Sequence, residues 1–134
     1  MRKQIALCIG NNDYKYNCLN KLDCAINDCI AISEKLTNLN FEVFCYENAD
    51  RTTMHAAIDD FEARLPGYDV ALFYYAGHGF ECNGHNLLMP VDTNGVDAIN
   101  LTARQYLIVG SNSRFENYDN GIDSHRTACF YIGE

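Results

Sequence analysis

The stretch Val70–Ala76 is apolar at every position, and no other part of the chain constrains the fold as strongly. A strand that is buried on both faces has this pattern, as in a parallel sheet with helices packed on each side. Two more strands are predicted earlier in the chain, at residues 4–9 and 41–46. The first is an apolar run stopped by Gly10, and the second mixes alternation with aromatic and β-branched residues.

Two amphipathic helices are predicted between these strands. Apolar residues recur at three- and four-residue steps within 22–39 and within 54–65, and a Pro-Gly pair ends the second stripe. The polar break before the second helix offers Asn48 and Asp50 as helix caps. The alternation of strand and helix predicts an α/β fold with a mainly parallel sheet and right-handed crossovers.

Composition and charge exclude several classes of function. The chain is 48% hydrophobic and 21% charged, as in an ordinary globular domain. Its net charge of -8 argues against a nucleic-acid partner or an anionic membrane surface, because either would require a basic patch. No apolar run is long enough to span a bilayer, and the run at 4–9 is shorter than the core of a signal peptide. A cytoplasmic location is expected.

The cysteines indicate neither a disulfide framework nor a metal site. There are 7 of them, an odd number, and no pair has C-x-x-C spacing. Buried hydrophobic positions suit most of them. His55, His85 and His125 have no neighbour at a metal-ligand spacing. No metal and no cofactor are therefore expected.

The end of the third predicted strand is a candidate site. In parallel α/β sheets ligands bind beyond the carboxyl ends of the strands, and this strand ends in Ala76-Gly77-His78-Gly79. Histidine suits proton transfer near neutral pH, and glycines leave backbone N–H groups free to face an oxyanion. The alternative interpretation is a turn in which the histidine merely ends a strand.

Three motifs in order resemble the caspase-like cysteine peptidases. They are KQIALCIGNNDY at 3–14, FYYAGHG at 73–79 and LMPVD at 88–92. Residues 2–105 resemble the large-subunit half of that fold, and the motifs are nearest those of paracaspases and metacaspases. The resemblance implies a caspase-like three-layer sandwich whose C-terminal strands are missing. It implies a partial catalytic large-subunit domain at 1–109 and an irregular or divergent tail at 110–134.

The same resemblance implies roles for individual residues. His78 corresponds to the general base, and the N–H of Gly79 to a donor of the oxyanion hole. Asp28, about 50 residues before His78, corresponds to an acid that lines the pocket for the residue before the cut. A carboxylate there favours Arg or Lys in the substrate. Without the resemblance, Asp28 is interpreted as a solvated helix acid.

The nucleophile is assigned by spacing alone. Cys129 follows His78 by about 50 residues, as the family requires. Its surroundings depart from the family pattern, because Thr127 stands in place of the acid and Phe130 in place of an arginine. Cys82 is closer to His78 in sequence, but the resemblance assigns it no role. The residues 101–109 fit either a helix or a strand.

Two functions follow as hypotheses. The first is a cysteine endopeptidase that cleaves proteins or peptides after Arg or Lys; the departures around Cys129 indicate a truncated or inactive form, a pseudoenzyme. The second is a non-catalytic caspase-like module that binds or regulates an active relative or a second copy of itself, since an incomplete sheet leaves an unpaired edge strand. A flavodoxin- or Rossmann-type ligand domain is disfavoured, because the first turn lacks G-x-G-x-x-G.

Overall fold

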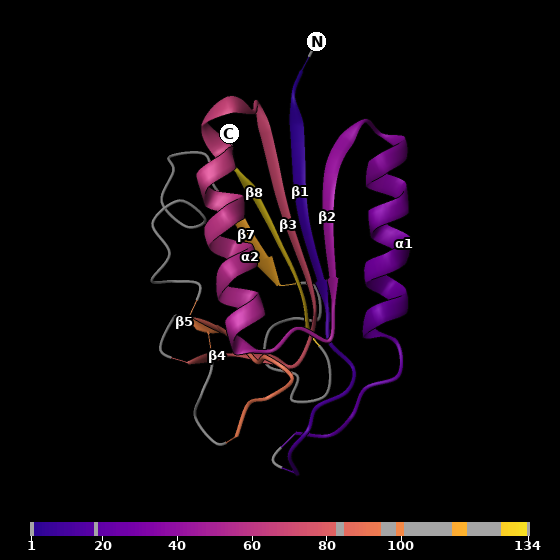
Figure 1. Cartoon of the computed structure of the whole chain (residues 1–134), viewed down its shortest axis with the longest axis vertical. Helices are drawn as coiled ribbons and strands as arrows, with labels where there is room; N and C mark the ends of the chain where they lie inside the picture. The colour runs from indigo at the N-terminus through magenta and orange to yellow at the C-terminus, as the bar shows by residue number, and fades with distance from the viewer. Residues whose placement is uncertain are drawn as a thin grey trace.

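The structure is a computed structural model in which helices flank a central sheet (Figure 1). It describes residues 2–17, 19–82 and 85–94, together with the strand backbones at 99–100, 114–117 and 127–133; side chains are described for 2–17, 19–79 and 88–94. The elements, in chain order, are β1 Gln4–Gly10, α1 Ala25–Asn38, β2 Phe41–Glu47, α2 Arg51–Arg64, the 3-10 turn η1 Leu65–Gly67, β3 Val70–Gly77, β4 Gly79–Cys82, β5 His85–Leu88, β6 Ile99–Asn100, β7 Arg114–Asn117 and β8 Thr127–Gly133.

The main sheet has the strand order β2-β1-β3-β8-β7. The strands β2, β1 and β3 are parallel, and their C-terminal ends coincide because Gly10 pairs with both Glu47 and Ala76. The strand β8 runs antiparallel to β3, and β7 runs antiparallel to β8. The strands β4, β5 and β6 form a separate small antiparallel sheet directly after β3.

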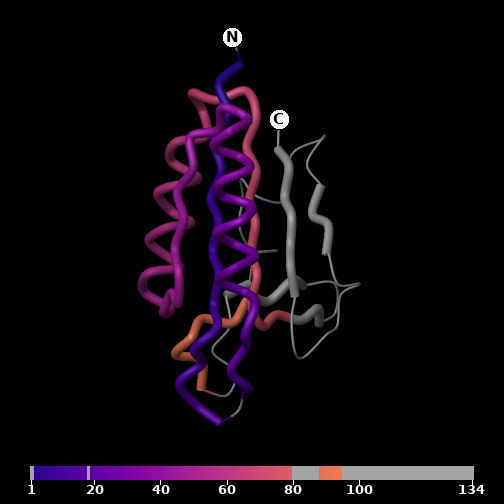
Figure 2. The backbone as a smooth tube through the Cα atoms, turned by 90° about the vertical axis from the view of Figure 1, so that its right-hand side faces the viewer, coloured from indigo at the N-terminus to yellow at the C-terminus, as the bar shows by residue number. Residues whose placement is uncertain are grey.

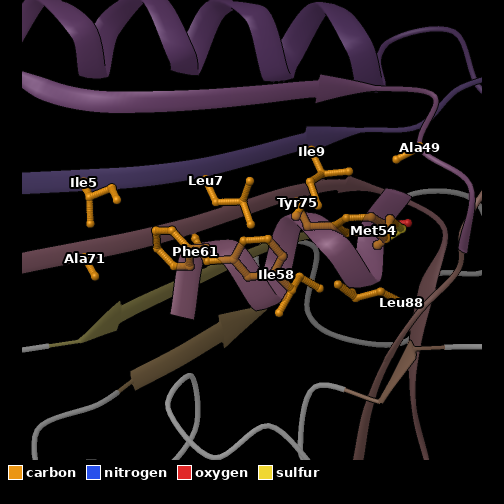
Figure 3. Packing of buried hydrophobic residues seen from close by; sticks show 12 residues of the cluster. Ile5, Leu7, Ile9, Ala49, Met54, Ile58, Phe61, Ala71, Tyr75 and Leu88 are labelled. Carbon is orange, nitrogen blue, oxygen red and sulfur yellow. The ribbon is translucent and has the colours of Figure 1, made fainter. Parts of the chain in front are cut away.

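One helix packs on each face of the three parallel strands. On one face, α2 packs on alternate residues of β1 and β3, and Figure 3 shows Phe61, Ile58 and Met54 of this helix against them. On the other face, α1 packs through Ala25, Cys29 and Leu36 on the remaining residues of the strands. This arrangement confirms the predicted α/β fold of the caspase-like type.

The helices and parallel strands lie within a few residues of their predicted bounds, because each carries its own hydrophobic period. Asp50 caps α2 as predicted, accepting a hydrogen bond from the Thr53 N–H at 2.8 Å. Asn48 caps no helix; it has a left-handed φ of 51° and binds another loop, described below.

Two strands are described near the C-terminal end of the chain. The strands β7 and β8 lie within 110–134, for which an irregular or divergent tail is predicted. The predicted helix or strand at 101–109 lies outside the described residues. The division of the chain at residue 109 stays a prediction. Within the described part, no helix is both long and apolar enough to cross a membrane.

Gly10 is a point of close approach between α1 and the sheet. A Cβ atom built there would lie 2.7 Å from Cys29 Cβ and 2.8 Å from the backbone oxygen of Ala25. Neither atom can move aside without moving the helix. Only glycine therefore allows α1 to pack at this depth.

We expect Gly10→Ala to lower the free energy of unfolding by about 1–3 kcal/mol, because the added methyl overpacks a buried contact. Urea denaturation followed by circular dichroism measures the change. Gly67→Ala is the matched control, since nothing lies within 4 Å of a Cβ there. Equal stability of the two variants would contradict the close approach.

Candidate active site

The candidate site lies where the parallel strands end. The loop 11–24 leaves β1 there, and the segment 88–94 returns to the same place; Figure 2 shows both at one end of the sheet. The two segments are joined directly, because the Lys15 N–H donates to the Val91 carbonyl at 2.9 Å. His78 follows β3 at this end.

Three asparagines fix the loop that follows β1. The Asn11 side chain is fully buried and accepts a hydrogen bond from the Ala49 N–H at 2.8 Å. The Asn12 side chain accepts from the Ile26 N–H at 3.1 Å and so satisfies the first turn of α1. The Asn48 side chain accepts from the N–H groups of Asn12 and Asp13, both at 3.0 Å. The N-N-D motif thus shapes the loop.

The segment 88–94 is anchored in the same way. The Val91 N–H donates to the Ala49 carbonyl at 3.0 Å, and an Asp92 carboxylate oxygen accepts from the Arg51 N–H at 2.8 Å. Asp92 therefore stabilises the first turn of α2 from outside the helix. The segment 88–94, which contains the M-P-V-D motif, forms a strap across the end of the sheet.

Two tyrosine hydroxyls hold the backbone of His78. The His78 N–H donates to the Tyr14 hydroxyl at 2.8 Å, and the Tyr75 hydroxyl donates to the His78 carbonyl at 2.7 Å. The Tyr14 hydroxyl donates to the Met89 carbonyl at 2.9 Å, and the Tyr75 hydroxyl oxygen lies 3.0 Å from the same carbonyl, so its single proton is shared between the Met89 and His78 carbonyls. Burial raises the pKa of Tyr14 to about 12, so this hydroxyl stays protonated at neutral pH.

Gly77 is required by these tyrosines. A Cβ atom on Gly77 would lie 2.5 Å from the Tyr75 hydroxyl oxygen and 2.8 Å from that of Tyr14. The first glycine of G-H-G therefore makes room for the hydrogen-bonded hydroxyls that position the histidine backbone.

The His78 ring is 2% exposed and has a defined proton position. Its Nε2 atom lies 2.7 Å from the carbonyl oxygen of Asn20. A carbonyl can only accept a hydrogen bond, so Nε2 carries the proton. The other nitrogen, Nδ1, is buried and has no hydrogen-bond partner among the described residues. The neutral ring therefore keeps its basic lone pair on Nδ1.

The Tyr14 ring restrains the imidazole from the side. The two ring centroids are 4.6 Å apart with an interplanar angle of 67°, an edge-to-face contact. Together with the Asn20 carbonyl, this contact fixes both the plane and the tautomer of His78. An imidazole held this way can accept a proton at Nδ1 without reorienting.

The other predicted site residues lie on elements around this edge. Asp28 is half-buried in the first turn of α1, near Gly10 at the end of β1. Gly79 begins β4 and pairs with Leu88. The backbone of Cys129 lies in β8 opposite Tyr75, three positions before His78 along β3. The roles of Asp28, Gly79 and Cys129 stay predictions.

Sequence reasoning missed three groups at the site. Tyr14 is part of the first motif, but its hydroxyl has no assigned role in the sequence analysis, and Tyr75 is counted only as a strand residue. The Asn20 contribution is a backbone carbonyl, which every residue possesses, so no sequence signal could reveal it. Among the described residues, no cluster of His, Cys, Asp or Glu could hold a metal ion.

We expect Tyr14→Phe to lower the free energy of unfolding by about 1–3 kcal/mol, because it leaves the buried His78 N–H without its acceptor. Urea denaturation measures the effect. Tyr16→Phe is the control, since Tyr16 is 46% exposed. A Tyr14→Phe variant as stable as this control would contradict the role of the hydroxyl.

Comparison with known proteins agrees with the motifs. Residues 3–114 match the sequence profile described as the caspase domain. The chain is 33% identical over 91 residues to mucosa-associated lymphoid tissue lymphoma translocation protein 1 of Homo sapiens, and equally to its homolog in Mus musculus. Each match covers 68% of this chain but 11% of the relative, so the chain spans about a tenth of these curated relatives. These matches confirm the predicted resemblance to caspase-like peptidases of the paracaspase type. The chain therefore belongs to the caspase domain family.

Proposed function

We propose that this domain is a cysteine endopeptidase in which His78 is the general base and Cys129 the nucleophile. The observation that carries the proposal is the state of the His78 ring. Its Nε2–H is held by the Asn20 carbonyl at 2.7 Å, and its basic Nδ1 is buried without a partner among the described residues. A buried nitrogen of this kind suits a group that receives a proton during catalysis.

The chemistry follows from that tautomer. Nδ1 takes the proton of the Cys129 thiol, and the thiolate attacks the peptide carbonyl carbon to give a tetrahedral oxyanion. The Asn20 carbonyl then faces the second N–H of the imidazolium and stabilises its positive charge. Collapse of the intermediate passes the proton from Nδ1 to the leaving amine, and water hydrolyses the acyl-enzyme. Gly79 N–H would donate to the oxyanion.

Asp28 is proposed to select a basic residue before the cut. It lies in the first turn of α1, at the end of the sheet where β3 leads into His78. A half-buried carboxylate gains most from a guanidinium or ammonium partner, which offsets its partial desolvation. Arg is favoured over Lys where the contact is bidentate.

A second function has an observation of its own. β8 runs antiparallel to β3, so Cys129 lies within a strand, opposite Tyr75, and not in a loop beyond the end of β3. This placement favours a non-catalytic module that binds or regulates an active relative or a second copy of itself. The two functions differ in whether Cys129 reacts in a way that depends on His78.

We expect a peptide probe that carries Arg and a thiol-reactive group to label Cys129 in the full chain. His78→Ala should slow this labelling by at least about 100-fold, because general-base assistance contributes about 10²–10⁴. Cys129→Ala should abolish it. Intact mass and peptide mapping measure the extent and position of the label. A probe that carries Asp in place of Arg controls for specificity.

Asp28→Asn should slow labelling by the Arg probe at least about tenfold, since one charge-assisted hydrogen bond is worth about 1.5–3 kcal/mol. Asp23→Asn is the matched control, because Asp23 is an exposed acid just before α1.

No labelling of a folded wild-type chain, or labelling at the same rate in His78→Ala, would contradict the endopeptidase and support the binding module. Sedimentation equilibrium would then test self-association.

A further inference from the structure

Three cysteines gather on the α1 face of the sheet. Cys8 of β1 and Cys45 of β2 are direct partners in the parallel register. Cys29 of α1 lies over them, and its sulfur is 3.5 Å from that of Cys45. None of these residues takes part in the proposed peptidase chemistry.

The three thiols differ in their access to solvent. Cys8 and Cys29 are fully buried, whereas Cys45 is exposed. Cys45 lines a groove of about 490 Å³ between α1 and β2, with Ser33 and Thr37 on the helix side. The strand β2 is at the edge of the sheet, beside α1 (Figure 1), and the groove is lined by residues of these two elements. A small solute can therefore reach Cys45 but not its two neighbours.

Burial makes Cys8 and Cys29 weaker acids than ordinary thiols. Burial raises the pKa of Cys8 to about 11. Burial, and secondarily the adjacent Cys45, also raise the pKa of Cys29 well above its ordinary value. Both buried groups are therefore protonated at neutral pH, and any reaction with an oxidant begins at the exposed sulfur.

We propose that Cys45 and Cys29 form a reversible disulfide when a hydroperoxide oxidises Cys45. The Cys45 sulfur attacks the peroxide, the O–O bond breaks, and a sulfenic acid and an alcohol or water are produced. The Cys29 sulfur then attacks the sulfenic sulfur, the S–O bond breaks, the S–S bond forms, and water leaves. The two thiols lose two electrons and two protons, and the peroxide gains them.

The geometry requires only a small adjustment. A disulfide bond is about 2.05 Å long, so the two sulfurs must approach by about 1.5 Å. Rotation about the Cα–Cβ bond of the exposed Cys45 can supply most of this movement. The bond would tie α1 to the edge strand β2 and close the loop between residues 29 and 45. Constraining the unfolded chain in this way stabilises the fold.

The test uses the full chain, reduced and then treated with one equivalent of hydrogen peroxide. The chain is then unfolded in guanidinium chloride and its remaining thiols are blocked with N-ethylmaleimide, and we expect two fewer adducts than in the reduced chain treated in the same way. Trypsin cuts after Lys21, Lys35 and Arg51, so the proposed bond links peptides 22–35 and 36–51. Dithiothreitol should release the two peptides. The midpoint of thermal unfolding should rise by about 10 °C on oxidation.

Two variants make the assignment specific. Cys45→Ser should abolish both the linked peptides and the rise in the unfolding midpoint. Cys24→Ser is the matched control, because Cys24 is an exposed cysteine in the same tryptic peptide as Cys29, and it should retain both effects. A bond from Cys45 to Cys8 or Cys24, or oxidation of Cys45 only to its sulfinic or sulfonic acid, would overturn the proposal.

Discussion

The candidate site depends on the hydrogen bonds of the Tyr14 hydroxyl group. It accepts the His78 N–H at 2.8 Å and donates to the Met89 carbonyl at 2.9 Å, so it joins the loop after β1, the end of β3 and the strap 88–94. These segments are far apart in the chain. A single buried hydroxyl therefore holds the histidine, its covering loop and the strap in one arrangement.

Close packing at the ends of the strands is the second constraint. Gly10 lets α1 sit against the sheet, and Gly77 leaves room for the hydroxyls of Tyr14 and Tyr75. The motifs that resemble caspase-like peptidases are thus largely supporting structure. They hold the backbone of His78, while the His78 ring nitrogen Nε2 meets the Asn20 carbonyl of the loop after β1 at 2.7 Å.

Local patterns account for what could be predicted from the sequence. The two helices and three parallel strands carry their own hydrophobic periods, and Asp50 is recognisable as a cap because it acts within four residues. The role of Asn48 depends on a loop some 35 residues away, so no local pattern reveals it. The strands β7 and β8 pair with each other, and β8 also pairs with β3. Residues 114–117 lack the apolar run by which a buried strand is recognised, whereas residues 128–132 carry such a run, which the prediction of a tail overlooks.

The same contrast between local patterns and contacts across the chain applies to the site residues. His78 could be predicted because glycines flank it at the end of a buried strand, and this placement follows from sequence order alone. Its tautomer could not, because it depends on a backbone carbonyl from a loop. The cysteine cluster was also hidden, since Cys8, Cys29 and Cys45 meet only when α1 packs on β1 and β2.

The central claim is that the Asn20 carbonyl fixes the neutral His78 ring with its proton on Nε2 and leaves Nδ1 basic. Long-range ¹H–¹⁵N correlation spectra of the full chain, labelled with ¹⁵N-histidine, test this directly. His78→Gln identifies the resonances of His78 among those of the other histidines. We expect a protonated Nε2 and a bare Nδ1 at a pH where the ring is neutral. A proton on Nδ1, or rapid averaging between the two tautomers, would contradict the central claim.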